Sequence, residues 1–235
     1  MRSLAILIAG EPVPAAFAAR GSYADMIRAV VGDAWQGPWQ DVDARAELPD
    51  FERFAGLIVT GSSANVPTRE AWILALEQYL ARAVRAGLPV FGICFGHQLL
   101  GQALGGLVTK NPKGREIGTV LLEVVASDPL LAGIEGPLWT NMTHIDSVVT
   151  LPPGAHVLAR SALDENAMVR FTERAWGVQF HPEIDREIIG HYVAARREAL
   201  SAEGLDASAI EAELADTPAA QAILRRFAAS SLLKC

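Results

Sequence analysis

The segment from Leu88 to Gln98 constrains the fold of this chain more than any other part of the sequence. Its first half, Leu88 to Ile93, has the length and composition of a strand buried on both faces of a parallel sheet. Cys94 follows at once, with a glycine two residues away on either side, and a helical pattern then runs from Gly96 to Leu104. Because a sharp strand-to-helix turn leaves room only for hydrogen at such flanking positions, the spacing predicts an elbow that presents Cys94.

Two further apolar runs, Leu4 to Ala9 and Gly56 to Thr60, precede this elbow. Between the second run and the elbow, Arg69 to Ala86 carries apolar residues at helical spacing and ends at Gly87, and Tyr23 to Val31 is a similar helix after the first run. Strands that alternate with helices form βαβ units. The sequence therefore predicts an α/β fold with a mostly parallel central sheet flanked by helices.

The second half of the sequence is rich in Val, Leu and Thr before it becomes helical again. Four strands packed on the same sheet are expected here, at Gly118–Val125, His156–Ser161, Ala167–Phe171 and Trp176–His181. Beyond Pro182 we expect a helix from Asp185 to Ser201, a break at residues 204–206 and Ala-rich helices to Leu233. Since no repeat or linker interrupts the pattern, we interpret residues 1–190 as one α/β domain and residues 191–235 as a helical C-terminal extension packed on it.

Composition and charge exclude several classes of partner. The 235 residues include 20 Lys and Arg against 27 Asp and Glu, and the net charge of −7 repels phosphate backbones and anionic lipid, so no nucleic acid is expected. The two cysteines, Cys94 and Cys235, fit a reducing cytoplasm better than a disulfide framework. No apolar run approaches the roughly 18 residues of a membrane span. The run from Leu4 to Ala9 is also too short for a signal peptide.

A cysteine at the start of a helix has the properties of a nucleophile, because the positive end of the helix dipole favours its thiolate form. Such a nucleophile needs a base and a group that orients the base. Of the five histidines, His181 fits best, because Pro182 forces a turn that lets Glu183 reach back to the imidazole. The alternatives are an inert buried cysteine and a strand-end histidine beside a solvated carboxylate.

An acyl-transfer site also needs N–H donors for a developing oxyanion. The strand ending at Thr60 runs into a loop of small residues at the sheet edge where the elbow of the next strand emerges. Backbone N–H groups near Gly61 and Ser62, together with that of Phe95, are natural donors, although a Gly-Ser turn is often no more than a turn. The sequence has no phosphate-binding glycine motif and no Cys-x-x-Cys zinc pattern, so we expect neither a cofactor nor a metal.

Three blocks of residues, in the right order, resemble the class I glutamine amidotransferases, a family with a Cys-His-Glu triad. These blocks are Thr60-Gly61-Ser62-Ser63, Gly92-Ile93-Cys94-Phe95-Gly96-His97-Gln98 and Gly177-Val178-Gln179-Phe180-His181-Pro182-Glu183. The similarity extends from about residue 1 to about residue 190 and implies a flavodoxin-like domain. Gly105-Gly106, the Glu116–Gly118 segment and the Met142–Asp146 segment make the chain most similar to free-standing relatives of the glutaminase domain of GMP synthase.

The resemblance implies that Cys94 is the nucleophile, that His181 is the general base and that Glu183 orients His181. The remaining implied contacts are Gly61 and Phe95 for the oxyanion, Gln98 for the substrate amide, and Ser62, His144 and Asp146 as further substrate contacts, the last two in a loop. The implied reaction is attack of the thiolate on the γ-amide of glutamine, release of ammonia and hydrolysis of a γ-glutamyl thioester. The Gly61-Ser62-Ser63 sequence departs from the Gly-Gly-Pro usual in GMP synthases.

Three functions stay open at this point. The leading one is a glutaminase, and the second is a γ-glutamyl peptidase, whose leaving amine is larger than ammonia. The third is a subunit that supplies ammonia to, or regulates, a separate synthase, with Asp185 to Leu233 either as its docking surface or as a helical cap on the core. No ATP-dependent synthase domain follows the matched blocks, so we do not expect GMP synthesis by this chain alone. A binding module without activity is disfavoured, because all three triad positions are present.

Overall fold

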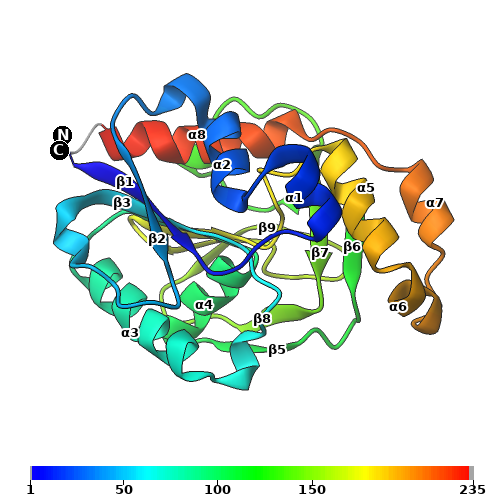
Figure 1. Cartoon of the computed structure of the whole chain (residues 1–235), viewed down its shortest axis with the longest axis horizontal. Coiled ribbons are helices and arrows are strands. Elements are labelled where there is room, and N and C mark those ends of the chain that lie inside the picture. Colours follow the sequence, from blue (N-terminus) through cyan, green and yellow to red (C-terminus); the bar gives the residue numbers. More distant parts are fainter. Residues whose placement is uncertain (1, 233–235) are drawn as a thin grey trace.

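The computed structural model describes residues 2–232 as three layers, with a large sheet between two layers of helices (Figure 1). The strands of the large sheet are β1 (Ser3–Ile8), β2 (Trp39–Asp43), β3 (Phe54–Val59), β4 (Val90–Ile93), β6 (Glu116–Val124), β7 (Leu138–His144), β9 (His156–Arg160), β10 (Met168–Thr172) and β11 (Ala175–Val178). They lie in the order β2-β1-β3-β4-β11-β10-β9-β6-β7. Two further strands, β5 (Leu107–Lys110) and β8 (Asp146–Thr150), form a separate antiparallel pair.

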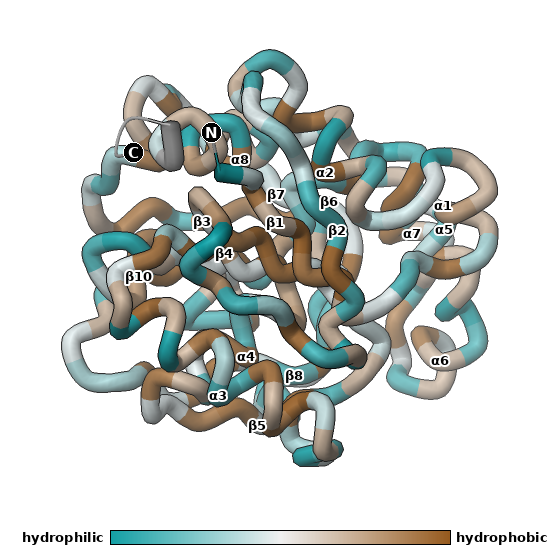
Figure 2. Tube along the Cα trace, turned by 60° about the vertical axis from the view of Figure 1, so that its left-hand side comes forward, coloured by the Kyte–Doolittle hydropathy of each residue, from teal (hydrophilic) through white to brown (hydrophobic). Residues whose placement is uncertain are grey.

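The large sheet is mixed, and its two halves differ in strand direction. Strands β2, β1, β3, β4 and β11 are parallel to one another, whereas β11, β10, β9, β6 and β7 pair antiparallel. The parallel half is the one that the apolar runs predict. In β1, Leu4 and Ile6 face one layer of helices and Ala5 and Leu7 face the other, and all four are completely buried. Figure 2 shows this apolar band as the brown trace through β1, β3 and β4.

The helices cover both faces of the sheet. They are α1 (Pro14–Arg20), α2 (Tyr23–Val31), α3 (Ala71–Arg85), α4 (Phe95–Ala103), α5 (Arg186–Ala195), α6 (Arg197–Ala202), α7 (Ala207–Ala212) and α8 (Pro218–Leu232), with short 3-10 turns at Gly32–Ala34, Phe51–Arg53, Val66–Thr68 and Pro129–Leu131. Helices α2 and α8 pack on one face, and α3 and α4 pack on the other (Figure 1). Helices α1, α5 and α7 share a third apolar cluster with Tyr23 and Tyr192.

The start of α2 is fixed by a reciprocal cap. The Ser22 hydroxyl accepts a hydrogen bond from the N–H of Asp25, and the Asp25 carboxylate accepts one from the N–H of Ser22. This capping box satisfies two N–H groups that would otherwise have no partner. It also fixes the position of Tyr23, the first residue of the helix, whose hydroxyl lies 2.6 Å from that of Tyr192 on α5.

Several elements differ from the sequence-based expectation. Helix α1 and strands β2, β5, β7 and β8 were not predicted, and the segment interpreted as a loop around His144 is the end of β7 and the start of β8. The helix expected from Asp185 to Ser201 is broken at Arg196. No glycine or proline stands there, and the break accompanies tertiary packing that buries Leu200 completely and places Arg196 over the ring of Tyr192. Leu233 and Cys235 lie outside the described residues.

None of the helices within residues 2–232 has the length and apolar character that crossing a membrane requires.

Candidate active site

Cys94 lies at the sharp bend between β4 and α4. Its backbone angles are φ 50° and ψ −102°, and it is one of two non-glycine residues with positive φ among those described. A Cβ added to Gly92 would lie 2.4 Å from the carbonyl oxygen of Gly96, and a Cβ on Gly96 would lie 2.5 Å from that of Val59. Both positions therefore admit only glycine, as the spacing predicts. The positive φ of Cys94 is a strained conformation. Such strain costs about 1–3 kcal/mol and persists where the surrounding structure enforces it.

His181 and Glu183 lie in the turn that follows β11. The strand ends at Val178 rather than at His181, and the imidazole Nδ1 lies 2.7 Å from Glu183 Oε1. Asn141 on β7 fixes the turn, because its carbonyl accepts the N–H of His181 at 2.8 Å and its side-chain amide donates to the carbonyl of Ile184 at 3.0 Å. Strand β7, in the antiparallel half of the sheet, thus holds the turn that follows β11, the last strand of the parallel half.

The imidazole of His181 is buried beside two acidic groups. Burial lowers its pKa, but the charge of the Glu183 carboxylate, the charge of the Cys94 thiolate and hydrogen bonds to both outweigh burial and raise the pKa to about 10. At neutral pH the ring is therefore protonated next to the sulfur. A cysteine beside an imidazolium can attack a carbonyl carbon through its sulfur, and the imidazolium can then donate a proton to the leaving group.

The loop after β3 brings Gly61 against His181. A Cβ on Gly61 would lie 2.8 Å from Cε1 of the imidazole, so only glycine lets the loop approach this closely. The backbone N–H groups of Gly61 and Phe95 have no hydrogen-bond partner among residues 2–232. N–H groups without partners beside a nucleophile can stabilise a developing oxyanion.

The hydroxyl of Ser62 is occupied within the protein. It donates to the carbonyl of Ala9 at 2.9 Å and accepts the N–H of Ala64 at 3.1 Å, so it holds the loop after β3 against the end of β1.

Gln98 and Asp146 are joined directly. Gln98 lies one helical turn beyond Cys94, and its side-chain amide donates to the carbonyl of Asp146 at 2.7 Å and to the side chain of Gln179 at 3.1 Å. The carboxyl of Asp146 keeps one oxygen, Oδ2, that is buried and has no partner. Burial raises the pKa of Asp146, and the charges of His144 and Lys110 act against this increase.

His144 belongs to a buried polar network. Its Nδ1 lies 3.0 Å from the carbonyl oxygen of Asp146, and its Nε2 lies 3.2 Å from Glu116 Oε2, which also accepts the hydroxyl of Ser161. Both ring nitrogens are thus engaged inside the protein, and through the Asp146 carbonyl the ring supports the same segment that Gln98 contacts.

Two tyrosines that the sequence analysis did not single out lie beside His181, and Arg196 contacts one of them. The ring of Tyr23 is stacked on the imidazole with centroids 6.0 Å apart, and the ring of Tyr192 lies 6.4 Å away. The guanidinium of Arg196 lies 4.9 Å from the ring centre of Tyr192. These residues come from α2, α5 and the break before α6, and no local motif marks them, because only the tertiary fold brings them to the elbow.

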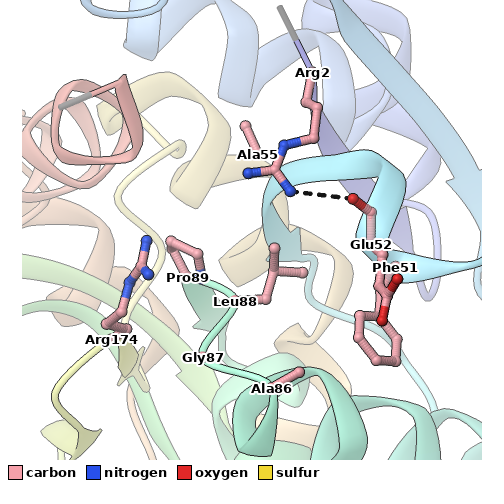
Figure 3. Close-up of a pocket in the computed structure, with 9 residues that line it drawn as sticks. All are labelled: Arg2, Phe51, Glu52, Ala55, Ala86, Gly87, Leu88, Pro89 and Arg174. Carbon is pink, nitrogen blue, oxygen red and sulfur yellow. Dashed lines mark hydrogen bonds between the residues drawn. The ribbon is translucent and has the colours of Figure 1, made fainter. Parts of the chain in front are cut away.

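A separate pocket of about 360 Å³ lies at the opposite edge of the same parallel strands (Figure 3). Figure 3 shows Arg2 and Arg174 on different sides of Leu88 and Pro89, with Arg2 donating a hydrogen bond to the carbonyl of Glu52. None of the predicted site residues lines this pocket. Within residues 2–232 no group of three His, Cys, Asp or Glu side chains is placed to hold a metal ion.

The chain belongs to the class I glutamine amidotransferase family, because the model of that family matches residues 38–197. This confirms the resemblance that the three sequence blocks indicate. The solved structure of a glutamine amidotransferase from Thermotoga maritima covers 99% of this chain and 99% of its own, with a TM-score of 0.72 and 17% identity. At that identity the likeness establishes a shared fold.

Two relatives with different names match this chain over different shares of their own length. A GMP synthase [glutamine-hydrolyzing] from Thermomicrobium roseum is 38% identical over 144 residues, which cover 59% of this chain and 25% of that enzyme. Gamma-glutamyl peptidase 4 from Arabidopsis thaliana is 32% identical over 179 residues, which cover 72% of this chain and 70% of that protein. The chain therefore spans about a quarter of the length of the synthase but most of the length of the peptidase.

Proposed function

We propose that this protein hydrolyses the γ-amide of glutamine, or of a related γ-glutamyl compound, through a thioester on Cys94. The observation that carries the proposal is a cysteine at a strained elbow whose charge acts on the buried His181 imidazole, which lies 2.7 Å from the Glu183 carboxylate that orients it. This is the arrangement of nucleophile, acid–base group and orienting carboxylate that acyl transfer requires.

In the first half-reaction the Cys94 thiolate attacks the amide carbon and forms a C–S bond. The amide oxygen takes up the negative charge between the N–H groups of Gly61 and Phe95. The carbon–nitrogen bond then breaks, and the proton on His181 moves to the departing nitrogen, which leaves as ammonia. His181 is now neutral and Glu183, a positioning residue, keeps its ring in place.

In the second half-reaction the neutral His181 takes a proton from water as the water oxygen attacks the thioester carbon. The C–S bond breaks, glutamate leaves and the thiolate–imidazolium pair is restored. His181 serves both proton transfers, since the proton that it gives to ammonia is replaced by the one that it takes from the attacking water.

The glutamyl part of the substrate is proposed to lie toward Gln98 and Asp146. The unpartnered Oδ2 of Asp146 is an acceptor suited to an ammonium group, and Gln98 holds the Asp146 segment next to the elbow. We propose Ser62 and His144 as contributors to binding through the backbone segments that they hold, since their polar atoms are engaged within the protein.

Hydrolysis of γ-glutamyl peptides is a second candidate function. The relative named gamma-glutamyl peptidase 4 matches over 70% of its own length, whereas the match to the Thermomicrobium GMP synthase covers 25% of that enzyme. The two functions share every chemical step and differ in the amine that leaves.

A third candidate is a partnership with a separate synthase that consumes the ammonia. A solved structure of a putative GMP synthase subunit from Thermoplasma acidophilum has a TM-score of 0.63 and 21% identity, and it covers 86% of this chain and 99% of its own. In this case the segment from Asp185 to Leu233 is the proposed docking surface rather than a helical cap on the core. A cytosolic setting that keeps Cys94 reduced suits all three candidates.

The test is to incubate the purified protein with glutamine and to measure ammonia release together with the mass of the intact protein. We expect turnover and a transient γ-glutamyl adduct on Cys94, and we expect Cys94→Ala to lose both at an unchanged melting temperature. The matched control is Cys94→Ser, which keeps a polar side chain of similar size but a much weaker nucleophile. Full amidase activity in Cys94→Ala would refute the proposal.

A further inference from the structure

The Arg196 guanidinium lies 4.9 Å from the ring centre of Tyr192, which is itself a neighbour of His181. Arg196 forms no ion pair within the described residues, and its Nη1 is buried without a hydrogen-bond partner. A contact between a guanidinium and an aromatic ring uses none of the N–H donors for a hydrogen bond. A buried charged donor without an acceptor is costly, so an arrangement of this kind is expected where a ligand supplies the acceptor.

The Arg196 guanidinium is partly buried. Burial lowers the pKa of the guanidinium, and the charge of Cys94 acts in the opposite direction. The ring of Tyr192 is a neighbour of both groups, because its centre lies 6.4 Å from that of the His181 imidazole and 4.9 Å from the Arg196 guanidinium.

Arg115 lies near Arg196, and a further cation, Lys110, lies near Asp146 and Glu203. Arg115 acts on the charge of Arg196, and Lys110 acts on the charges of Asp146 and Glu203. Glu203 is fully used by Arg115, which contacts it through two hydrogen bonds of 2.8 and 2.9 Å. Arg196 thus keeps an uncompensated positive charge next to the site, in a protein whose net charge is −7.

The chemistry of the reaction places the leaving amine on this side of the site. The imidazolium of His181 must lie next to the departing nitrogen in order to protonate it. A substituent on that nitrogen that follows the ring of Tyr192 would approach Arg196, since Tyr192 is a neighbour of both groups. In an amino acid the carboxylate carbon is only two bonds from the amine nitrogen, and its planar oxygens match the donor geometry of a guanidinium.

Taking the proposed hydrolysis at Cys94 as its basis, we propose that Arg196 selects γ-glutamyl substrates whose leaving amine carries a carboxylate, that is, γ-glutamyl amino acids and short γ-glutamyl peptides. The bond that breaks is the γ-amide carbon–nitrogen bond, and the proton passes from His181 to the amine of the departing amino acid. Water then releases glutamate from Cys94, as with glutamine. Arg196 takes part only in binding, and it gains its acceptor when the substrate enters.

The test compares kcat/KM for γ-glutamylglycine with that for γ-glutamylglycinamide, which differs only by the loss of the negative charge, and measures glutamine beside them. We expect the wild-type protein to prefer γ-glutamylglycine by about 10- to 100-fold, the size of a charged hydrogen-bonded pair. In Arg196→Gln this ratio should fall to about one, and in Arg196→Lys, which keeps the charge without the planar donors, it should stay between the two. The matched control is Arg197→Gln, because Arg197 is the next residue, is exposed and pairs with Glu211.

Four results would overturn the inference. One is a wild-type ratio near one, and another is glutamine turnover without cleavage of γ-glutamylglycine. A third is an equal loss for all three substrates in Arg196→Gln at an unchanged melting temperature, which would assign Arg196 to the glutamyl part common to them. The last is a wild-type protein that cleaves none of the substrates and forms no adduct on Cys94. This result would refute the proposed function as well, whereas the first three would refute only the inference about Arg196.

Discussion

The two edges of the parallel strands β1, β3, β4 and β11 belong to the same chain segments but differ in backbone strain and in buried polar atoms without partners. At the carboxyl ends the protein keeps a strained Cys94 and buried polar atoms without partners on Glu183, Gln179 and Asp146. At the amino ends the pocket in Figure 3 is bordered by Arg2 and Arg174, and none of its lining residues has a buried side-chain atom without a partner.

Each buried polar group without a partner costs about 1–3 kcal/mol, and the strain at the elbow adds a similar amount. Strands β3, β4 and β11 are buried along their whole length, so burial of the strands does not distinguish the two edges. Near the amino edge the hydroxyl of Tyr79, which packs against Phe51, is a buried group without a partner. The carboxyl edge differs because it combines backbone strain with three such groups, for which the proposed substrate would supply partners.

The largest loss of activity among the variants considered at the two edges is expected from Glu183→Gln. The amide has nearly the same shape but no charge, so it no longer favours the imidazolium of His181. Loss of the orienting carboxylate of a catalytic histidine costs up to about 10⁴ in kcat, and we expect a loss of at least about a thousandfold. The matched control is Glu187→Gln, which removes an exposed carboxylate from α5, where it pairs with Arg20.

The pH profile separates this role of Glu183 from a merely structural one. The pKa of His181 is raised to about 10, so the wild-type kcat/KM should fall as the pH rises through about 10, where the imidazolium loses its proton. In Glu183→Gln the alkaline limb should move to lower pH. The stability that the protonated ring contributes has the same sign, present below the unfolded pKa of about 6.5 and lost as the pH rises toward 10. An unmoved alkaline limb would contradict the assignment.

Smaller effects are expected when Gly61 and Gly87 are each replaced by alanine. Gly61→Ala, at the carboxyl edge, should lower kcat/KM, whereas Gly87→Ala, at the amino edge, should lower the free energy of unfolding. Gly61→Ala places a Cβ 2.8 Å from His181 Cε1, and Tyr23 and Glu183 hold the ring so that it cannot turn away freely. A displacement of about 1 Å costs on the order of 100-fold in rate, so kcat/KM should fall by about that factor.

Gly87 lies at the amino edge with φ of +77° and has open space around its added Cβ. Gly87→Ala should therefore lower the free energy of unfolding by about 1–2 kcal/mol, because alanine is strained in a left-handed conformation, and should leave kcat/KM unchanged. Chemical denaturation and steady-state kinetics on both variants give the comparison. If Gly87→Ala lost activity, or Gly61→Ala kept it, the two edges would not differ as described.

The parallel half of the fold was predictable because buried parallel strands such as β3 and β4 are apolar along their whole length. β2 and β7 were not predictable in this way. β2 is a half-buried edge strand, and β7 carries Asn141 and His144, which are buried only because the fold supplies their hydrogen-bond partners. Residue patterns report hydrophobic burial, and they do not report polar groups that tertiary contacts satisfy.

The candidate site divides in the same way. Cys94 and its two glycines, and the short path from His181 to Glu183, are local features, and the sequence therefore predicts them. Tyr23 and Arg196 carry no local mark, because one begins an ordinary capped helix and the other lies in what looks like an unbroken one. The place of Tyr23 beside the imidazole, and that of Arg196 over Tyr192, depend on how α2 and α5 pack together at the end of the sheet.

The smallest effect is expected from Arg174→Gln at the amino edge. The carbonyl of Arg174 accepts the N–H of Val90, and this backbone contact survives a change of side chain, while its guanidinium forms no ion pair among residues 2–232. We expect kcat/KM within about twofold of wild type and a free energy of unfolding within about 0.5 kcal/mol. Arg196→Gln, by contrast, is expected to remove the substrate preference. Comparison of the two variants tests whether the effect of an arginine without an ion-pair partner depends on which edge of the strands it occupies. A loss of activity in Arg174→Gln comparable to that in Arg196→Gln would show that the two edges are coupled through the strands between them.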